Sequence, residues 1–222
     1  AVWLKADAIN PDDPNQVRSV GPDRVVTRWN TSGGILGPAV QTEGARQPEW
    51  RAQGFKDVPV VHFDGSDDSL RLDRSVGTNG FTLIAVARAS VPHEIESESA
   101  QGVGGTSGQR WLFGPELGGD WNGGAGLSLG NNGASVYEHG SGYMPALAVA
   151  PFEPRPTFVL VSVVYDDRRP RLYLDGTLAR EGLRSPRSAV TAPIEIGAGA
   201  YGAFGGDVAE ILLFNRALTE TE

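Results

Sequence analysis

The sequence predicts an all-β protein, folded as a two-sheet antiparallel β-sandwich. Its 222 residues include 30 Gly and 15 Pro. Between them lie short runs rich in Val, Ile, Leu, Phe and Tyr instead of the longer stripes of amphipathic helices. Two stacked sheets suit this pattern because alternate residues from both inner faces then share one interior. The length fits a single domain over residues 1–222.

The expected strands follow one another along the whole chain. Each is a short run of β-branched, aromatic or aliphatic residues that ends at Gly, Pro, Asp or Asn. These runs are residues 2–6, 24–29, 59–64, 69–72, 81–89, 110–114, 126–130, 134–138, 158–166, 171–175, 177–180, 194–197 and 207–214.

Three of these segments carry further information. Asp175 and Gly176 suit the two positive-φ positions of a type I′ turn, so residues 171–180 form a β-hairpin. Residues 81–87 and 158–165 are apolar on both faces, which places them centrally in a sheet. The segment 207–214 is expected to pair with the first strand near Trp3 and so to close the sheet.

Two stretches, residues 10–21 and 92–109, are rich in Pro, Gly, Ser and acidic residues and are expected to be loops. At the end of the chain, Thr219 and Glu222 have the spacing of a capping box, which predicts the start of a helix.

Composition excludes several classes of protein. The net charge is -8, and Lys occurs only at Lys5 and Lys56, whereas nucleic-acid binding needs clustered basic residues. The longest apolar run is far shorter than the ~20 residues that span a bilayer. Cys is absent, so disulfides and thiolate metal sites are excluded. Because the sequence begins at Ala1 without a Met or a signal peptide, we interpret it as a module of a larger protein.

Five segments, in this order, carry a family resemblance: WLKAD at 3–7, VVHFDGSDDSL at 60–70, FTLIA at 81–85, YD with LYLDG at 165–176, and GDVAEILLFNRAL at 206–218. Their order is similar to that of the laminin G-like jelly-roll modules of the concanavalin A-like lectin/glucanase superfamily, which are common in large bacterial surface and secreted proteins. The resemblance covers almost the whole chain. It implies a jelly roll and a secreted or cell-surface location.

An acidic segment invites a catalytic interpretation. Glu94, Glu96 and Glu98 alternate as the paired carboxylates of glucanases do. However, Pro92 precedes them and Ser and Gly follow, which does not fit a central strand. We therefore expect a solvated acidic loop without a catalytic role.

A calcium site is the cofactor expectation. Asp64, Asp67 and Asp68 place three carboxylates close to one turn, and Ca²⁺ prefers such oxygen ligands. Glu210 or Asp207 of the last strand could add a ligand. The alternative is a turn whose Asp side chains bind only their own backbone. Relatives of this fold often carry calcium, although many have Asp-Glu where Ala209-Glu210 stands.

The expected ligand-binding patch centres on the sequence YEHGSGY at 137–143. Tyr137 and Tyr143 can stack on a sugar ring, and Glu138 with His139 can bind a hydroxyl or a cation. Trp121, in a Gly-rich loop, can extend this patch. In the alternative, the Glu-His pair is a buried hydrogen-bonded pin and Tyr143 packs over the core.

The resulting functional hypothesis is a noncatalytic carbohydrate-recognition or adhesion module of a larger extracellular bacterial protein. Its partners are a glycan or neighbouring protein domains, with neither nucleic acid nor a membrane span. Fold resemblance carries this hypothesis, since one fold hosts many functions. Two alternatives remain: a polysaccharide hydrolase or lyase, which needs a long cleft with facing carboxylates or a Tyr/His pair, and a structural spacer, which needs no open concavity and buries Glu138 and Tyr143.

Overall fold

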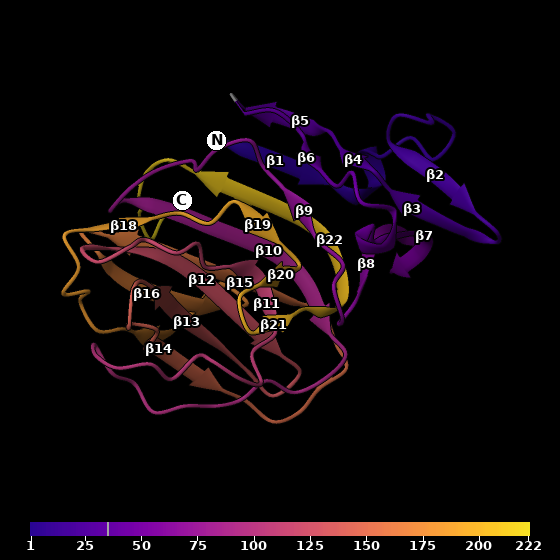
Figure 1. Cartoon of the computed structure of the whole chain (residues 1–222). Helices are drawn as coiled ribbons and strands as arrows, with labels where there is room; N and C mark the ends of the chain where they lie inside the picture. Colours follow the sequence, from indigo (N-terminus) through magenta and orange to yellow (C-terminus); the bar gives the residue numbers. More distant parts are fainter. Residues whose placement is uncertain (35) are drawn as a thin grey trace.

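The computed structural model describes residues 1–34 and 36–222 and contains two large β-sheets packed face to face (Figure 1). The strand order of the first sheet is β17-β16-β15-β10-β22-β8-β7-β3-β2, and β1 pairs with both β22 and β5. The order of the second sheet is β14-β13-β12-β11-β19-β9-β6-β4, and β18 pairs with β12. Apart from the parallel β12–β18 pair, the pairings within the two sheets are antiparallel. The two-sheet sandwich expected from the sequence is confirmed.

The strands of the first sheet are β1 Val2–Lys5, β2 Val17–Val20, β3 Asp23–Val26, β5 Thr31–Gly34, β7 Glu49–Phe55, β8 Val58–Asp64, β10 Phe81–Ala89, β15 Val159–Asp166, β16 Arg169–Leu174, β17 Thr177–Glu181 and β22 Gly205–Phe214. Those of the second are β4 Arg28–Trp29, β6 Ala39–Val40, β9 Leu70–Arg71, β11 Trp111–Gly114, β12 Asn122–Gly130, β13 Gly133–His139, β14 Ala146–Pro151, β18 Ala189–Thr191 and β19 Glu195–Ile196. A hairpin of β20 Ala198–Gly199 and β21 Gly202–Ala203 and two 3₁₀ turns, η1 Ala6–Ala8 and η2 Gly44–Arg46, complete the described elements.

The last strand joins distant parts of the chain. Along one edge β22 pairs with β10, and along the other it pairs with β1, where Trp3 lies opposite Leu212 and Leu4 opposite Ile211. Figure 1 shows the first and last strands side by side, near the labels of both termini. The predicted pairing of the two end segments is therefore confirmed.

One continuous core fills the space between the sheets. Its members are inward-facing residues of both layers, among them Trp29, Phe63, Phe81, Leu127 and Tyr165. The central placement of 81–87 and 158–165 is confirmed, because β10 and β15 are neighbours inside the first sheet. The predicted hairpin is also confirmed: Asp175 and Gly176 have φ values of 51° and 80°.

Several local predictions were wrong. Residues 17–20 lie in the predicted loop 10–21 but form β2, because each pairs with a residue of β3. The predicted strand 24–29 divides at Thr27 into β3 and β4, which belong to different sheets. The strands β7 and β14 were not predicted. Residues 219–222 form a turn in which the Glu222 carboxylate accepts the Thr219 amide at 3.2 Å.

Candidate functional site

The outer face of the second sheet carries a row of residues that crosses five strands, β4, β6, β9, β19 and β11. Each member lies directly opposite the next: Arg28, Val40, Arg71, Glu195 and Gly114. The sequence neighbour of each one is buried on the core side: Trp29, Ala39, Leu70, Ile196 and Phe113. Since neighbouring strands lie about 4.8 Å apart, the row is about 19 Å long.

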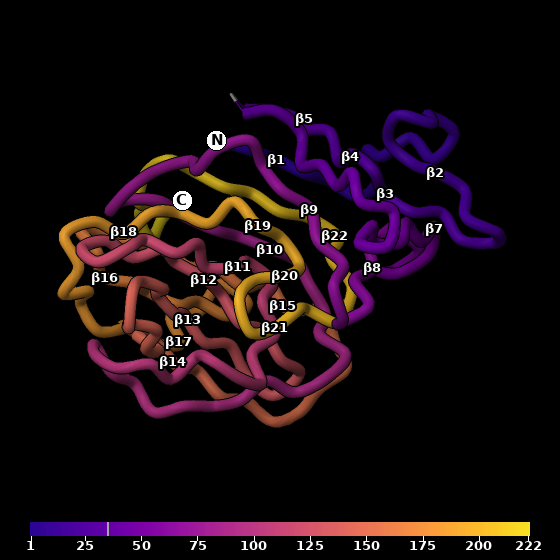
Figure 2. Tube along the Cα trace, in the orientation of Figure 1, coloured from indigo at the N-terminus to yellow at the C-terminus, as the bar shows by residue number. Residues whose placement is uncertain are grey.

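The other half of this face is covered by loops. The chain between β10 and β11 runs past β14 (Figures 1 and 2) and bonds to it, with the Ser99 amide donating to the Ala146 carbonyl at 2.9 Å. The segment after β11 lies against β12, where a Cβ on Gly124 would come within 2.0 Å of the Glu116 carbonyl oxygen. Only the half that carries the row is therefore open.

Two adjoining hollows follow the open half. One, of about 720 Å³, lies over Arg28, Val40 and Arg71. The second, of about 390 Å³, lies over Gly114 and His139, and the two share Arg46 and Glu195. We call the two together the cross-strand groove. The hairpin β20–β21 bounds the groove at β11, because residues 198–200 line the second hollow.

Arg71 is the centre of an ion-pair network in the groove. Its guanidinium donates to Glu116 at 3.0 and 3.2 Å and to Glu195 at 2.6 Å. The hydrogen bonds with Glu116, and then those with Glu195, raise the pKa of Arg71 above its usual value. Arg46 is 3.9 Å from Glu43. The groove thus offers fixed N–H donors beside carboxylate acceptors.

One ring lines the second hollow and a second ring lies beside it. The imidazole of His139 and the phenol of Tyr201 have centroids 6.3 Å apart in an edge-to-face arrangement. His139 Nδ1 donates to the Pro115 carbonyl at 3.3 Å, and Tyr201 is 57% exposed. Tyr201 is therefore largely exposed beside His139, which lines the second hollow. Nothing in the sequence pattern had singled it out.

Trp121 is 77% exposed at the tip of the loop before β12. Its backbone is nevertheless fixed, because the Ser188 amide donates to the Trp121 carbonyl at 2.9 Å and Arg187 donates to the Asp120 carbonyl. A large aromatic side chain on a fixed loop suits recognition of a ring.

Glu138 forms the buried pin foreseen as the alternative to a sugar contact. It is 0% exposed and accepts bonds from Tyr143 at 3.1 Å, Tyr165 at 3.2 Å and Ser185 at 2.5 Å. Burial, which outweighs these hydrogen bonds, raises the pKa of Glu138 to about 7. Tyr165 belongs to the first sheet, so the carboxyl ties the two sheets together.

Tyr137 and Tyr143 are also inside the protein. Tyr137 is 0% exposed and packs edge-to-face on Trp111 with centroids 5.3 Å apart, and Tyr143 is 4% exposed beneath the Arg187 guanidinium. Of the five residues expected to bind ligand, only His139 and Trp121 therefore reach a surface. The other three hold the loops that surround them.

The acidic segment 94–98 has no regular secondary structure. Glu98 bonds to Arg180 at 2.7 Å and accepts the Val149 amide at 2.9 Å. Burial works against the charge of Glu98, but Arg180 outweighs it and holds the pKa below its usual range. Glu98 thus holds the covering loop in place. For Glu96, burial and then the neighbouring Glu94 carboxylate raise the pKa.

The expected metal ligands separate into two groups. Asp64, Asp67 and Asp68 bring one carboxylate oxygen each within 4.8 Å of one another. Burial, followed by the two neighbouring carboxylates, raises the pKa of Asp68 to about 6. Glu210 does not belong to this group: Asp64 pairs with Gly205, five positions earlier on β22, and Glu210 accepts a bond from Trp3.

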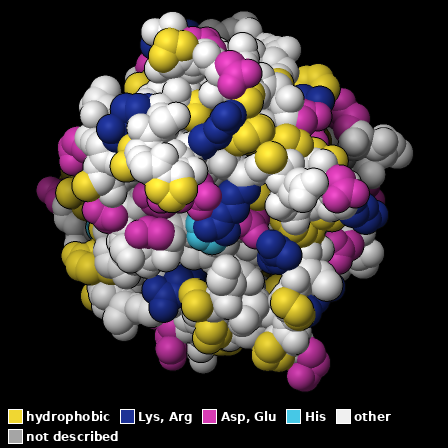
Figure 3. All heavy atoms as spheres, turned by 90° about the vertical axis from the view of Figure 1, so that its right-hand side faces the viewer, with side chains coloured by type: hydrophobic (Ala, Val, Ile, Leu, Met, Phe, Trp, Pro, Cys, Tyr) yellow, Lys and Arg dark blue, Asp and Glu magenta, His cyan; other side chains and the backbone are white. Residues whose placement is uncertain are grey.

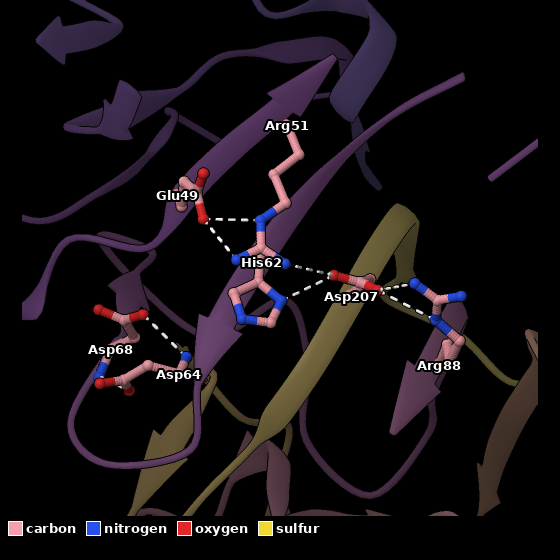
Figure 4. A network of polar contacts seen from close by, with 7 residues as sticks. All are labelled: Glu49, Arg51, His62, Asp64, Asp68, Arg88 and Asp207. Carbon is pink, nitrogen blue, oxygen red and sulfur yellow. Dashed lines mark hydrogen bonds and ion pairs between the residues drawn. The ribbon is translucent and has the colours of Figure 1, made fainter. Parts of the chain in front are cut away.

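Asp207 likewise serves a different network, drawn in Figure 4. His62 Nδ1 lies 2.7 Å from its carboxylate, and Arg88 Nε donates at 3.0 Å. Burial disfavours the charge, but His62 and Arg88 outweigh it and lower the pKa of Asp207. Figure 3 shows that acidic and basic side chains are mixed over one face of the molecule, with a histidine among them. His62 thus holds the buried Asp207 carboxylate within the first sheet.

Together, the fold and groove define a jelly-roll sandwich with one half-open face. The chain belongs to the concanavalin A-like lectin/glucanases superfamily, since the Laminin_G_3 family model, which carries that description, matches residues 64–222, more than half of the chain. No curated protein matches the sequence. Across the described residues, no helix is long and apolar enough to cross a membrane.

Three solved structures that share the fold belong to carbohydrate-active enzymes. Domain 4 of an extracellular arabinanase from Geobacillus stearothermophilus, in complex with arabinotriose, matches with a TM-score of 0.59 at 14% identity, over 99% of this chain and 94% of that chain. Trypanosoma rangeli sialidase matches at 0.56 and 16% identity, over 100% of this chain and 31% of that chain. An arabinofuranosidase complexed with arabinofuranosyl-alpha-1,2-xylobiose matches with a TM-score of 0.55 at 11% identity, over 90% of this chain and 49% of that chain. The matches thus span less than half of each of the latter two chains.

Proposed function

We propose that the protein is a noncatalytic carbohydrate-recognition module of an extracellular protein and that the cross-strand groove holds the glycan. One observation carries the proposal: a row of residues with the Arg71–Glu195 pair at its centre crosses five strands, and its end at β11 lies in the same hollow as His139, whose ring contacts the exposed Tyr201. The carbohydrate-active proteins that share the fold support it.

The chemistry of the groove suits sugars. A sugar ring presents hydroxyls at its edge and C–H groups on its faces. Arg71 and Glu195 supply a donor and an acceptor side by side for the hydroxyls. Tyr201 supplies an apolar ring face for the C–H groups. His139, and Trp121 beyond the groove, keep the binding role expected from the sequence.

A hydrolase is the alternative that one observation favours. Glu116 and Glu195 both accept from Nη1 of Arg71, at 3.0 and 2.6 Å, which brings two carboxylates as close as those of a retaining glycosidase. However, a glycosidase uses one carboxyl as a proton donor, and here both groups are acceptors for one guanidinium. An assay for new reducing ends separates the two functions. A recognition module binds the glycan without releasing reducing ends, whereas a hydrolase releases them.

The spacer alternative predicted buried Glu138 and Tyr143 and no open concavity. The first part matches the structure, whereas the groove is open. A spacer predicts no glycan binding at all, and this difference provides the test.

We further propose a structural Ca²⁺ at Asp64, Asp67 and Asp68, without Glu210. The donor set fits a hard cation, which binds carboxylate oxygens. Part of that capacity is already used by the turn itself, because Asp64 Oδ1 accepts the Ser66 amide at 2.8 Å. The alternative of a turn that binds only its own backbone is tested below.

The experiment for glycan recognition uses a glycan array followed by calorimetry on the chain and on Arg71→Ala. We expect binding that Arg71→Ala weakens by about tenfold or more, with little change in stability, since half-exposed ion pairs contribute at most about 1 kcal/mol. Glu181→Gln, which alters an exposed ion pair on the edge strand β17, is the matched control. An empty array contradicts the proposal.

A further inference from the structure

The charges in the cross-strand groove restrict the kind of glycan that fits. Three arginines line the two hollows, and four carboxylates line them with the arginines: Glu43, Asp73, Glu116 and Glu195. The groove therefore has no excess of positive charge. The chain as a whole carries a net charge of -8, which repels an approaching polyanion.

Two of the three arginines, Arg71 and Arg46, are also already occupied, and Arg28 lies at the far end of the row. Arg71 is bonded to two carboxylates, and Arg46 lies beside Glu43 and donates to the Asp67 carbonyl at 3.2 Å. A carboxylate or sulfate on a sugar would have to displace one of these partners and would then lie next to the displaced carboxylate, and this like-charge contact is unfavourable. A hydroxyl avoids this cost, because it can accept from the guanidinium and donate to the carboxylate at the same time.

The shape of the groove favours a chain over a single sugar. The row is about 19 Å long, and the two hollows are continuous through Arg46 and Glu195. Binding energy can thus accumulate over several sugar units. A pocket for one terminal sugar would be closed on all sides, whereas this groove runs across the strands.

Building on the proposed function, we infer that the groove selects an uncharged oligosaccharide chain, bound across the strands, and discriminates against acidic glycans. Glu116 and Glu195 are the specificity-determining residues, because they neutralise Arg71, the arginine at the middle of the groove.

The test compares matched ligands and a charge-relieved variant by calorimetry. Neutral arabino-, xylo- and gluco-oligosaccharides, from the disaccharide to the hexasaccharide, are compared with oligogalacturonides, their methyl esters and sialyllactose. We expect affinity for a neutral series to rise with chain length and acidic chains to bind at least about tenfold more weakly. In Glu116→Gln/Glu195→Gln, which frees Arg71, the acidic chains should gain affinity relative to the neutral ones. Glu181→Gln should change neither.

The outcomes separate the two levels of the proposal. Acidic chains that bind as well as neutral ones, affinity that does not grow beyond one sugar, or a double variant with unchanged selectivity would overturn the inference and leave glycan recognition standing. If no glycan of either kind binds, the proposed function fails and the inference fails with it.

Discussion

Arg71 and Glu195 lie directly opposite each other on β9 and β19, and the guanidinium donates to the carboxylate at 2.6 Å although 124 positions separate the two residues in the sequence. The pair stands at the midpoint of the row that crosses the open half of the second sheet. Both side chains point away from the core, so their contribution is to the surface that a ligand meets.

Removal of the Tyr201 ring should weaken glycan binding without unfolding the protein. The side chain is 57% exposed, so Tyr201→Ala should change the free energy of unfolding by no more than about 0.5 kcal/mol. Loss of a stacking face should cost about 0.5–1.5 kcal/mol of binding free energy. Calorimetry and urea denaturation measure the two quantities. Unaltered affinity would place the glycan elsewhere.

Gly114→Ala should displace the hairpin that bounds the groove. A Cβ on Gly114 would come within 2.0 Å of the Ala198 carbonyl oxygen, so the backbone must move. We expect a loss of about 1–3 kcal/mol of stability together with weaker glycan binding. Gly33→Ala on β5 is the control, because a Cβ there meets no atom within 4 Å. Equal stability of both variants would contradict the close packing of the hairpin.

The buried Glu138 should make stability fall as the pH rises. Its pKa in the folded state is about 7, above the ordinary 4.5, so the folded state binds the proton more tightly. The stability from this group is fully present below pH 4.5 and is lost as the pH rises to about 7.

Glu138→Gln isolates this effect. The free energy of unfolding of the variant minus that of the parent should increase between pH 4.5 and 7, by at most about 3 kcal/mol. Urea denaturation across this range gives the difference, with the exposed Glu153→Gln as control. A difference that does not vary with pH would show that Glu138 is not a buried carboxyl.

Calcium should raise the melting temperature, and Asp67→Asn should abolish that rise. Saturating Ca²⁺ at about 100 times its dissociation constant stabilises the folded state by about 2.7 kcal/mol. Asp67 is exposed, so the substitution should alter the metal-free protein little. Thermal unfolding with calcium and with chelator measures both effects. Identical unfolding curves with calcium and with chelator would contradict the calcium site and would support the alternative, in which the Asp side chains bind only the backbone of their own turn.

The fold was predictable because its main strands carry local signals. Asp175-Gly176 specifies its hairpin by turn chemistry, and the apolar runs of β10 and β15 specify a core position. The missed strands lack such signals: β7 contains mostly polar and half-exposed positions, and β14 is rich in Ala, which has low β-propensity.

The site was predictable only in part. The sequence singled out His139 and Trp121, but the burial of Tyr137, Glu138 and Tyr143 depends on tertiary cover from segments 93–109 and 185–187.

The groove itself joins Arg28, Arg71 and Glu195 through strand order. Since such neighbours are distant in the chain, no local pattern could reveal them.

Chemical-shift mapping of the labelled chain, titrated with the neutral oligosaccharide that binds best in the array, tests the central claim most directly. The account predicts that the perturbed resonances cluster on Arg71, Glu195, His139 and Tyr201 and that the opposite face around His62 and Asp207 stays unchanged. Perturbations confined to that opposite face, or none at saturating ligand, would contradict it.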